Sequence, residues 1–325
     1  MNFFSKVDIP ASDLRIDHKS NLAFIGSCFA DNISAQFASR KFKVQANPFG
    51  TVYNPVSLAS QTKAIADGKV FGEEDVFQDT RCDGLWHCWD AHSSLSGATK
   101  EECIGKLNDA TTQARDFLKK ASVIFITLGT AFVYYLKDSG KPVSNCHRQD
   151  PNLFTRRMIS VDEATEAIRE ITASIRQLNQ HAQIVFTVSP LRHMSDGAHN
   201  NTLSKATLQL AINKEIATSP LAPRNDTVDY FPGYEIVMDE LRDYRFYAED
   251  MIHLSKTAEE YIFERMVETY CDSTTRENIA KVEKFLKMTN HRIQDENSPA
   301  TQEFKEKLAK QAAELEKGIT GLKLD

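Results

Sequence analysis

Leu22-Ala23-Phe24-Ile25-Gly26-Ser27-Cys28-Phe29-Ala30 is the stretch of this sequence that decides the fold. Its apolar residues 22–25 are typical of a buried strand, and a helical pattern begins soon after Gly26. The turn between them places Ser27 at the tip of the strand, beside the free N–H groups of a new helix. A nucleophilic serine of acyl-transfer chemistry has this setting, and so has an ordinary N-cap or turn serine.

The alternation of apolar runs and helical patterns continues along the chain. Apolar runs predict strands at 22–25, 42–46, 122–128, 183–188 and 227–231. Helical spacing predicts helices at 31–40, 101–120, 161–180, 204–218, 233–243 and 255–270. Nearly continuous apolar strands are typical of a parallel sheet that helices cover on both faces. The pattern therefore predicts a doubly wound α/β sandwich with its ligand site at the carboxyl ends of the strands.

Two irregular stretches and a change of composition interrupt this alternation. Residues 71–100 and 137–157 show no clear period, and loops of this length usually build a site. After Cys271 the chain becomes rich in Lys, Glu and Ala, with apolar residues at helical spacing. We therefore expect a main domain at 1–272 and a helical extension at 273–325. The extension either caps the domain or pairs with another chain in a homo-oligomer.

The overall charge limits the classes of partner. The net charge is −6, and no block of Lys and Arg is present, which argues against nucleic acid or an anionic membrane surface. No apolar run approaches 18 residues and the N-terminus lacks a signal-like apolar segment, so a cytoplasmic protein is expected. The cysteines show neither zinc nor disulfide spacing and are expected to be free thiols, with no metal and no cofactor.

Asp250 and His253 are the candidate partners of Ser27. A serine needs a base within hydrogen-bond reach, and a histidine base needs an acceptor on its other ring nitrogen. Asp-x-x-His on one turn supplies that acceptor, although the same spacing also occurs in a surface turn before a helix. Cys28 is a rival nucleophile, because a thiolate forms readily at a helix N-terminus; burial of the thiol under the turn is the simpler interpretation.

Gly26-Ser27-Cys28-Phe29-Ala30 spells the signature for which the GSCFA family is named, and the sequence resembles this family over roughly 20–270. Further matching segments are 47–50, 128–131, 145–147, 189–193, 201–206 and 250–253. The family is placed with the SGNH (GDSL-like) hydrolases, so the resemblance implies a flavodoxin-like three-layer α/β sandwich. It also implies a metal-free triad with Ser27 as nucleophile, His253 as base and Asp250 as its partner.

The resemblance leaves one part of the oxyanion hole open. SGNH enzymes usually donate from the serine N–H, from a glycine after the second strand and from an asparagine in a Gly-x-Asn motif. Ser27 and Gly50 suit the first two roles, but Gly129-Thr130-Ala131 has alanine where the asparagine is expected. Thr130, or Asn145 and His147 from the long loop, are the candidate replacements; an Asx turn is the alternative role of Asn145.

Aromatic and basic residues near the expected site are candidates for substrate binding. Arg192 either holds a substrate oxygen or forms a structural ion pair. Trp86 and His92, in the first irregular stretch, suit stacking on a sugar ring, and ordinary packing is the alternative. We expect a serine esterase that removes small, acetyl-like acyl groups, with a small-molecule or carbohydrate ester as substrate. The rival functions are acyl transfer by the same triad and a catalytically silent protein that binds ligands.

Overall fold

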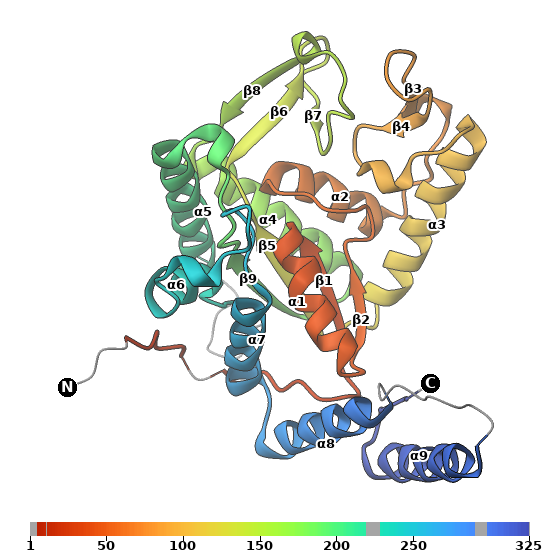
Figure 1. Cartoon of the computed structure of the whole chain (residues 1–325). Coiled ribbons are helices and arrows are strands. Elements are labelled where there is room, and N and C mark those ends of the chain that lie inside the picture. The colour runs from red at the N-terminus through yellow and green to blue at the C-terminus, as the bar shows by residue number, and fades with distance from the viewer. Residues whose placement is uncertain (1–4, 11, 219–227, 290–297, 325) are drawn as a thin grey trace.

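The computed structural model describes residues 5–10, 12–218, 228–289 and 298–324. Its core is a sheet of parallel strands in the order β10-β9-β5-β1-β2 (Figure 1). The bounds are Asn21–Gly26 for β1, Lys43–Ala46 for β2, Val123–Leu128 for β5, Gln183–Val188 for β9 and Val228–Tyr230 for β10. The five expected strands are therefore present, although Thr227 of the last one lies outside the described residues.

The strand order places Ser27 at the end of β1, where the direction in which strands are added to the sheet reverses. From β1 the chain moves to β2 on one side and later returns to β5 on the other side. This is the flavodoxin-like order, in which the crevice between β1 and its neighbour on the opposite side is the usual ligand site. Ser27 directly follows β1, beside β5, and its N–H donates to the Thr127 carbonyl at 3.1 Å.

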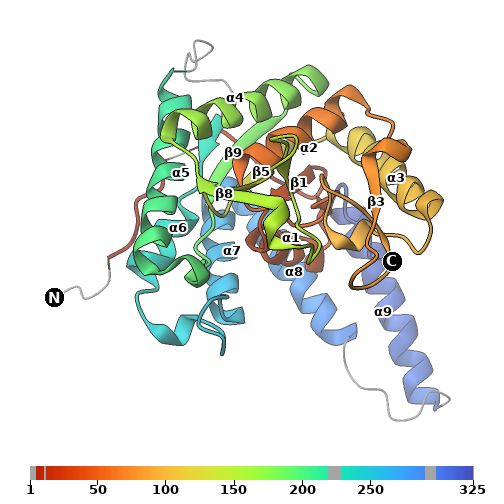
Figure 2. The ribbon, with the colours of Figure 1, turned by 90° about the horizontal axis from the view of Figure 1, so that it is seen from above.

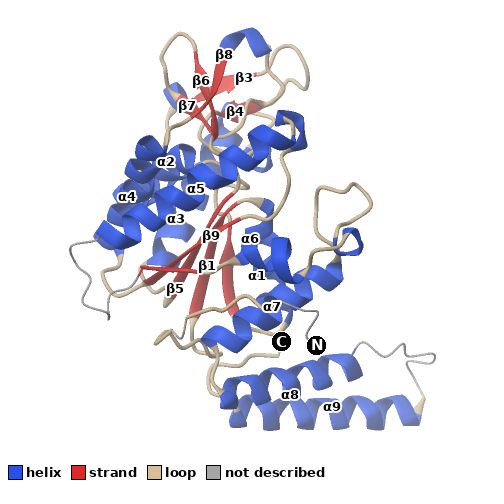
Figure 3. Ribbon diagram, turned by 90° about the vertical axis from the view of Figure 1, so that its left-hand side faces the viewer, coloured by secondary structure: helices blue, strands red, loops and turns tan. Residues whose placement is uncertain are grey.

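Helices cover both faces of the sheet (Figure 3). The helices of one face are α2 (Pro55–Asp67), α3 (Lys100–Leu118), α4 (Val161–Leu178) and α5 (Ala198–Thr218). The other face holds α1 (Cys28–Ser39), α6 (Gly233–Glu235), the π-helix Ile236–Glu240 and α7 (Lys256–Tyr270). Alternate strand residues explain this division, because Ala23 and Ile25 pack on the first face and Leu22 and Phe24 on the second. The expected α/β sandwich is confirmed.

Two small sheets form a lid at the carboxyl edge of the central sheet. One lies in the irregular stretch 71–100, and the other begins just before the stretch 137–157 and continues through it. Strands β3 (Val76–Gln78) and β4 (Trp86–Cys88) make a hairpin. Strands β6 (Phe132–Leu136), β7 (Pro142–Val143) and β8 (Phe154–Met158) make an antiparallel sheet. Figure 2 shows β8 in front of the central sheet and β3 to one side, beside α3, and Figure 3 shows both small sheets beyond the ends of the central strands, so the lid lies at this edge.

The C-terminal helices lie at the opposite end of the sheet from the lid (Figure 3). Helix α8 (Ser273–Thr289) packs against α9 (Pro299–Gly318). The buried guanidinium of Arg40 joins α1 to this region, because it pairs with Glu260 of α7 and with Glu283 of α8. The helices therefore cap the domain, and their pairing with a second chain stays a prediction. Among the helices of the described residues, none is long and apolar enough to cross a bilayer.

Candidate functional site

Ser27 is the N-cap of α1 and is almost completely buried, with 1% of its surface exposed. Its side chain makes no capping hydrogen bond, and its hydroxyl has no partner among the described residues. An unpaired buried hydroxyl is unfavourable unless it serves a function or binds a group that arrives later. The plain N-cap interpretation of Ser27 therefore lacks the hydrogen bond that would define it.

Asp250 and His253 form the expected pair. The Asp250 carboxylate lies 2.6 Å from Nδ1 of His253, and it also accepts the backbone N–H groups of Ile252 and His253. These hydrogen bonds lower the pKa of Asp250 to about 2, and the bond to the His253 imidazole has the largest effect. The carboxylate thus stays charged and fixes the ring, so Nε2 of His253 points away from Asp250 and remains available as a base.

A chain of contacts brings the His253 segment to the start of α1. His253 and Glu259 of α7 interact electrostatically, and Glu259 accepts a hydrogen bond from Asn32 of α1 at 2.6 Å. Asn32 is one helical turn beyond Cys28, on the same side of α1. The carbonyl of Ile252 also accepts the Arg192 N–H after β9. These contacts bring the His253 segment to α1 and to the end of β9, but no hydrogen bond joins Ser27 to His253 in the described residues.

The hydrogen bonds do not support Gly50 and Thr130 as oxyanion donors. The Gly50 N–H donates to the Asn47 carbonyl at 2.7 Å, in a turn where Gly50 has a φ of +79°. The Thr130 N–H donates to the Tyr53 carbonyl at 3.0 Å, and its hydroxyl pairs with Ser204. The sequence placed both residues correctly after strands, but it could not show that their N–H groups already donate to backbone carbonyls.

The lid contains the expected oxyanion donor Asn145 and two residues expected to bind substrate, His147 and Trp86. Asn145 Oδ1 accepts the His147 N–H at 2.8 Å, which is the Asx turn considered from the sequence. His147 is buried, and its Nε2 lies 2.8 Å from the Cys88 carbonyl, so it joins the two small sheets. Trp86 pairs with Gly97 in the hairpin. These contacts favour structural roles for Asn145, His147 and Trp86.

His92 lies between the lid and the Gly50 turn. Its N–H donates to the Phe49 carbonyl, and its Nδ1 accepts the Ser94 N–H. A Cβ atom on Gly50 would overlap the Cβ of His92. Glycine is therefore required at position 50 by close contact as well as by its backbone conformation.

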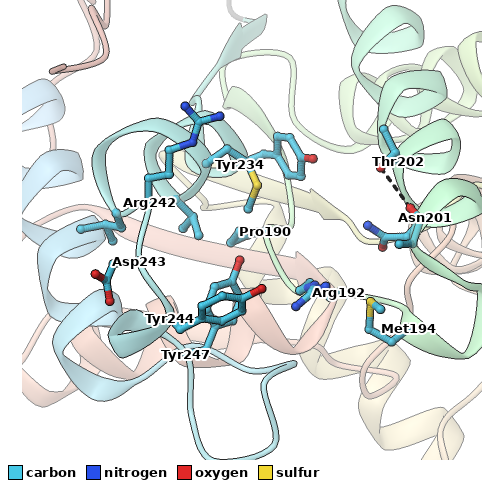
Figure 4. Close-up of a pocket in the computed structure, with 14 residues that line it drawn as sticks. Pro190, Arg192, Met194, Asn201, Thr202, Tyr234, Arg242, Asp243, Tyr244 and Tyr247 are labelled. Atoms are coloured by element: carbon cyan, nitrogen blue, oxygen red, sulfur yellow. Dashed lines mark hydrogen bonds between the residues drawn. The ribbon is translucent and has the colours of Figure 1, made fainter.

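Arg192 lines a cavity of about 400 Å³ at this edge of the sheet (Figure 4). Three tyrosines share the lining: Tyr234, Tyr244 and Tyr247. The Arg192 guanidinium lies 5.9 Å from the ring centre of Tyr247, and the described residues give it no carboxylate partner. Tyr247 pairs with Leu254 in an antiparallel β-bridge, so this part of the cavity wall and the His253 segment belong to the same short loop. Of the residues expected to bind substrate, Arg192 alone lines this cavity.

Lys205 of α5 is a residue that sequence reasoning missed. It is 1% exposed, and its Nζ donates to the carbonyl of Gly129 at 2.5 Å and to that of Ser189 at 2.7 Å. Burial lowers its pKa to about 7, which the electrostatic interaction with Cys28 partly opposes. The only signal in the sequence was a lysine inside a matching family segment, and spacing did not distinguish it from a surface lysine.

The surroundings of Cys28 do not favour the reactive thiolate that its helix position suggests. Burial raises the pKa of its thiol, and the Asp31 carboxylate raises it further. The N–H groups of Cys28 and Phe29 act in the opposite direction but do not outweigh burial. The thiol is therefore protonated near neutral pH and weakly reactive.

One group of side chains in the described residues has the arrangement of a cation site, and it lies in the lid. Asp79, Asp83 and His87 bring their ligand atoms within 4.8 Å of one another. The Asp79 carboxylate already accepts the N–H groups of Arg81, Cys82 and Asp83. Its oxygens are therefore satisfied by the turn.

Comparison with known proteins identifies a family and distantly similar solved structures. An acetyl xylan esterase from the rumen bacterium Butyrivibrio proteoclasticus is similar at 13% identity, with a TM-score of 0.37. The match covers 81% of this chain and 64% of that one, so this chain spans less than two thirds of that structure. No curated protein matches the chain. The GSCFA family profile matches residues 21–266, so the chain belongs to the GSCFA family.

Proposed function

We propose that this protein is a serine esterase that hydrolyses small O-acyl esters. The observation that carries the proposal is the Asp250–His253 pair, with 2.6 Å between carboxylate and Nδ1; the buried, unpaired hydroxyl of Ser27 supports it. The pair leaves Nε2 of His253 as a proton acceptor. Ser27 stands at the strand end where α/β folds bind ligands.

The reaction would proceed in two halves. His253 Nε2 takes the hydroxyl proton of Ser27 while Oγ forms a bond to the ester carbonyl carbon. The tetrahedral intermediate then breaks its bond to the alcohol oxygen, and His253 returns the proton to that alcohol. A water molecule next gives a proton to His253 while its oxygen bonds to the acyl carbon. The bond from that carbon to Oγ then breaks, His253 returns the proton to Oγ, and the carboxylic acid leaves. Asp250 holds the imidazole and stabilises its charged form throughout.

We propose an acylated carbohydrate as the substrate, with an acetyl-like group on one hydroxyl. The cavity beside the His253 segment supports this choice, because tyrosine rings stack well on sugar rings. Arg192 stands among them with its guanidinium available to a sugar oxygen or carboxylate. Tyr244 is largely exposed at the rim, where a long glycan chain has room to continue into solvent.

The proposal is tested with a panel of aryl acetates, propionates and butyrates and with fluorophosphonate labelling. Wild-type protein should hydrolyse the shortest ester best and be labelled on Ser27, whereas Ser27→Ala should lose both properties. Ser39→Ala, at the exposed end of the same helix, is the matched control and should keep them. Cys28→Ala should also be labelled, since the reacting atom is an oxygen. Full activity of Ser27→Ala would contradict the proposal.

A catalytically silent binding protein is the second candidate function. The observation that favours it is the burial of Ser27 together with the used N–H groups of Gly50 and Thr130. In that case folded wild-type protein stays unlabelled and inactive. A carbohydrate ester would then still bind in the cavity, which calorimetry with Arg192→Ala as the comparison would detect.

A further inference from the structure

The ammonium group of Lys205 is a buried cation for which the described residues provide no carboxylate partner. Its two hydrogen bonds go to backbone carbonyls at the ends of β5 and β9, on either side of the site. A buried charge without a counter-ion is strongly unfavourable. Such a group is retained most simply where an anion forms or binds during function.

The surroundings of Lys205 locate that anion. The Gly129 carbonyl that Lys205 binds lies two residues beyond Thr127, whose carbonyl accepts the Ser27 N–H, so the amine lies near the turn that carries Ser27. The neighbouring residue, Ser204, accepts the Ala131 N–H at 2.7 Å. Helix α5 therefore docks onto the 129–131 turn, where alanine stands in place of the expected asparagine donor.

We propose that Lys205 supplies the positive charge of the oxyanion site, donating its third N–H to the acyl oxygen as negative charge develops there. This inference rests on the proposed esterase function. The two carbonyl bonds hold Nζ in place before the substrate arrives, as electrostatic stabilisation of a transition state requires. Ser27 and His253 keep their roles as nucleophile and base.

The groups that face Lys205 leave this charge uncompensated. Cys28 on α1 stays a neutral thiol, and Tyr53 before α2 has a pKa raised by burial. Burial, followed by the charge of Lys205, lowers the pKa of His193 to about 4, so His193 is neutral at pH 7. Asp31, on the next turn of α1, is the nearby acid and interacts with both Cys28 and Tyr53. Its carboxylate accepts from Asn47 and Thr51.

The test compares Lys205→Met with Lys214→Met, an exposed lysine farther along the same helix that serves as the matched control. Steady-state kinetics on an aryl acetate give kcat and KM, and thermal unfolding reports the fold. Lys205→Met should lower kcat about 100-fold or more, the usual effect of losing one oxyanion donor. KM should change little, and the melting temperature should not fall in proportion. Lys214→Met should match the wild type.

A third variant separates charge from proton transfer. Lys205→Arg keeps the positive charge but cannot accept a proton near neutral pH, so it should recover part of the lost kcat. Should the arginine fail to fit, as a lowered melting temperature would show, the ratio of wild-type kcat to Lys205→Met kcat at each pH decides, because the base His253 contributes to both profiles. An electrostatic role predicts that this ratio declines as Lys205 loses its proton; a base role predicts that it rises over the same range.

Four results would overturn the inference. A kcat for Lys205→Met within a few-fold of the wild type removes Lys205 from the site and leaves the esterase function intact. A parallel change in kcat, KM and melting temperature assigns Lys205 to the fold alone. A ratio of wild-type to Lys205→Met kcat that rises as Lys205 loses its proton makes it a base. Wild-type protein without esterase activity or fluorophosphonate labelling overturns the esterase function and this inference together.

Discussion

Replacing Lys205 by methionine should change how the free energy of unfolding depends on pH. Burial lowers the pKa of Lys205 from the ordinary lysine value of 10.5 to about 7. Between these two values the unfolded chain binds a proton that the folded chain does not. Stability must therefore rise with pH across this range, since stability increases wherever the unfolded state binds more protons.

The magnitude follows from the difference in pKa. From pH 6 to pH 9 a lysine with these two pKa values gains about 3 kcal/mol of stability, because each unit of separation corresponds to about 1.4 kcal/mol. Other titrating groups contribute similar amounts to the wild type and to Lys205→Met. Their effects cancel when the two unfolding free energies are subtracted at each pH. The difference between wild type and variant should thus shift by about 3 kcal/mol in favour of the wild type.

Urea denaturation at four or five pH values between 6 and 9 measures this difference. Methionine is a suitable replacement because its unbranched side chain follows the same path as the lysine stem. It leaves two carbonyls without their donor, a loss that is the same at every pH. A difference that stays constant from pH 6 to pH 9 would show that Lys205 keeps an ordinary pKa and that its charge is compensated in the folded protein.

Two further predictions concern the base and the Gly50 turn. Asp250→Asn should lower kcat by about 10³- to 10⁴-fold with unchanged folding, because an amide lets His253 adopt the wrong tautomer; steady-state kinetics and circular dichroism check this, and a loss below tenfold would contradict the pairing. Gly50→Ala should lower the free energy of unfolding by at least about 2 kcal/mol, from the strain of a positive φ and overlap with His92. Gly84→Ala, with a φ of +72° and open space around it, should lose only the strain part in the same urea titrations.

The central sheet could be predicted because its signals are local. Each strand is an apolar run, and the alternation with helices leaves few arrangements for a chain of this length. Helix α2 was missed although its boundaries were marked, by Asn54 and Pro55 at the start and by Gly68 at the end. Its many small polar residues weaken the apolar period. The sheet of β6, β7 and β8 was missed because its strands are short and pair through tertiary contacts.

The candidate site divides in the same way. Asp250 and His253 are three residues apart, so their contact follows from one turn of chain and could be predicted. The state of the Gly50 and Thr130 donors depends on Asn47 and Tyr53, whose carbonyls reach them only in the folded protein. The cavity beside Arg192 likewise combines segments from β9, α5 and the 233–247 region, which no spacing connects.

Lys205 shows why the oxyanion site could not be assigned from motifs alone. The Gly-x-Asn motif places its asparagine donor directly after Gly129 and Thr130, and this chain has Ala131 at that position. The replacement comes from a helix some 75 residues later, whose lysine reaches the carbonyl of Gly129 itself. An amide donor supplies a fixed dipole at any pH, whereas an ammonium supplies a full charge that burial can remove. A site built in this way stabilises an oxyanion strongly when Lys205 is protonated and becomes sensitive to pH near neutrality, so the same residue links catalysis to stability.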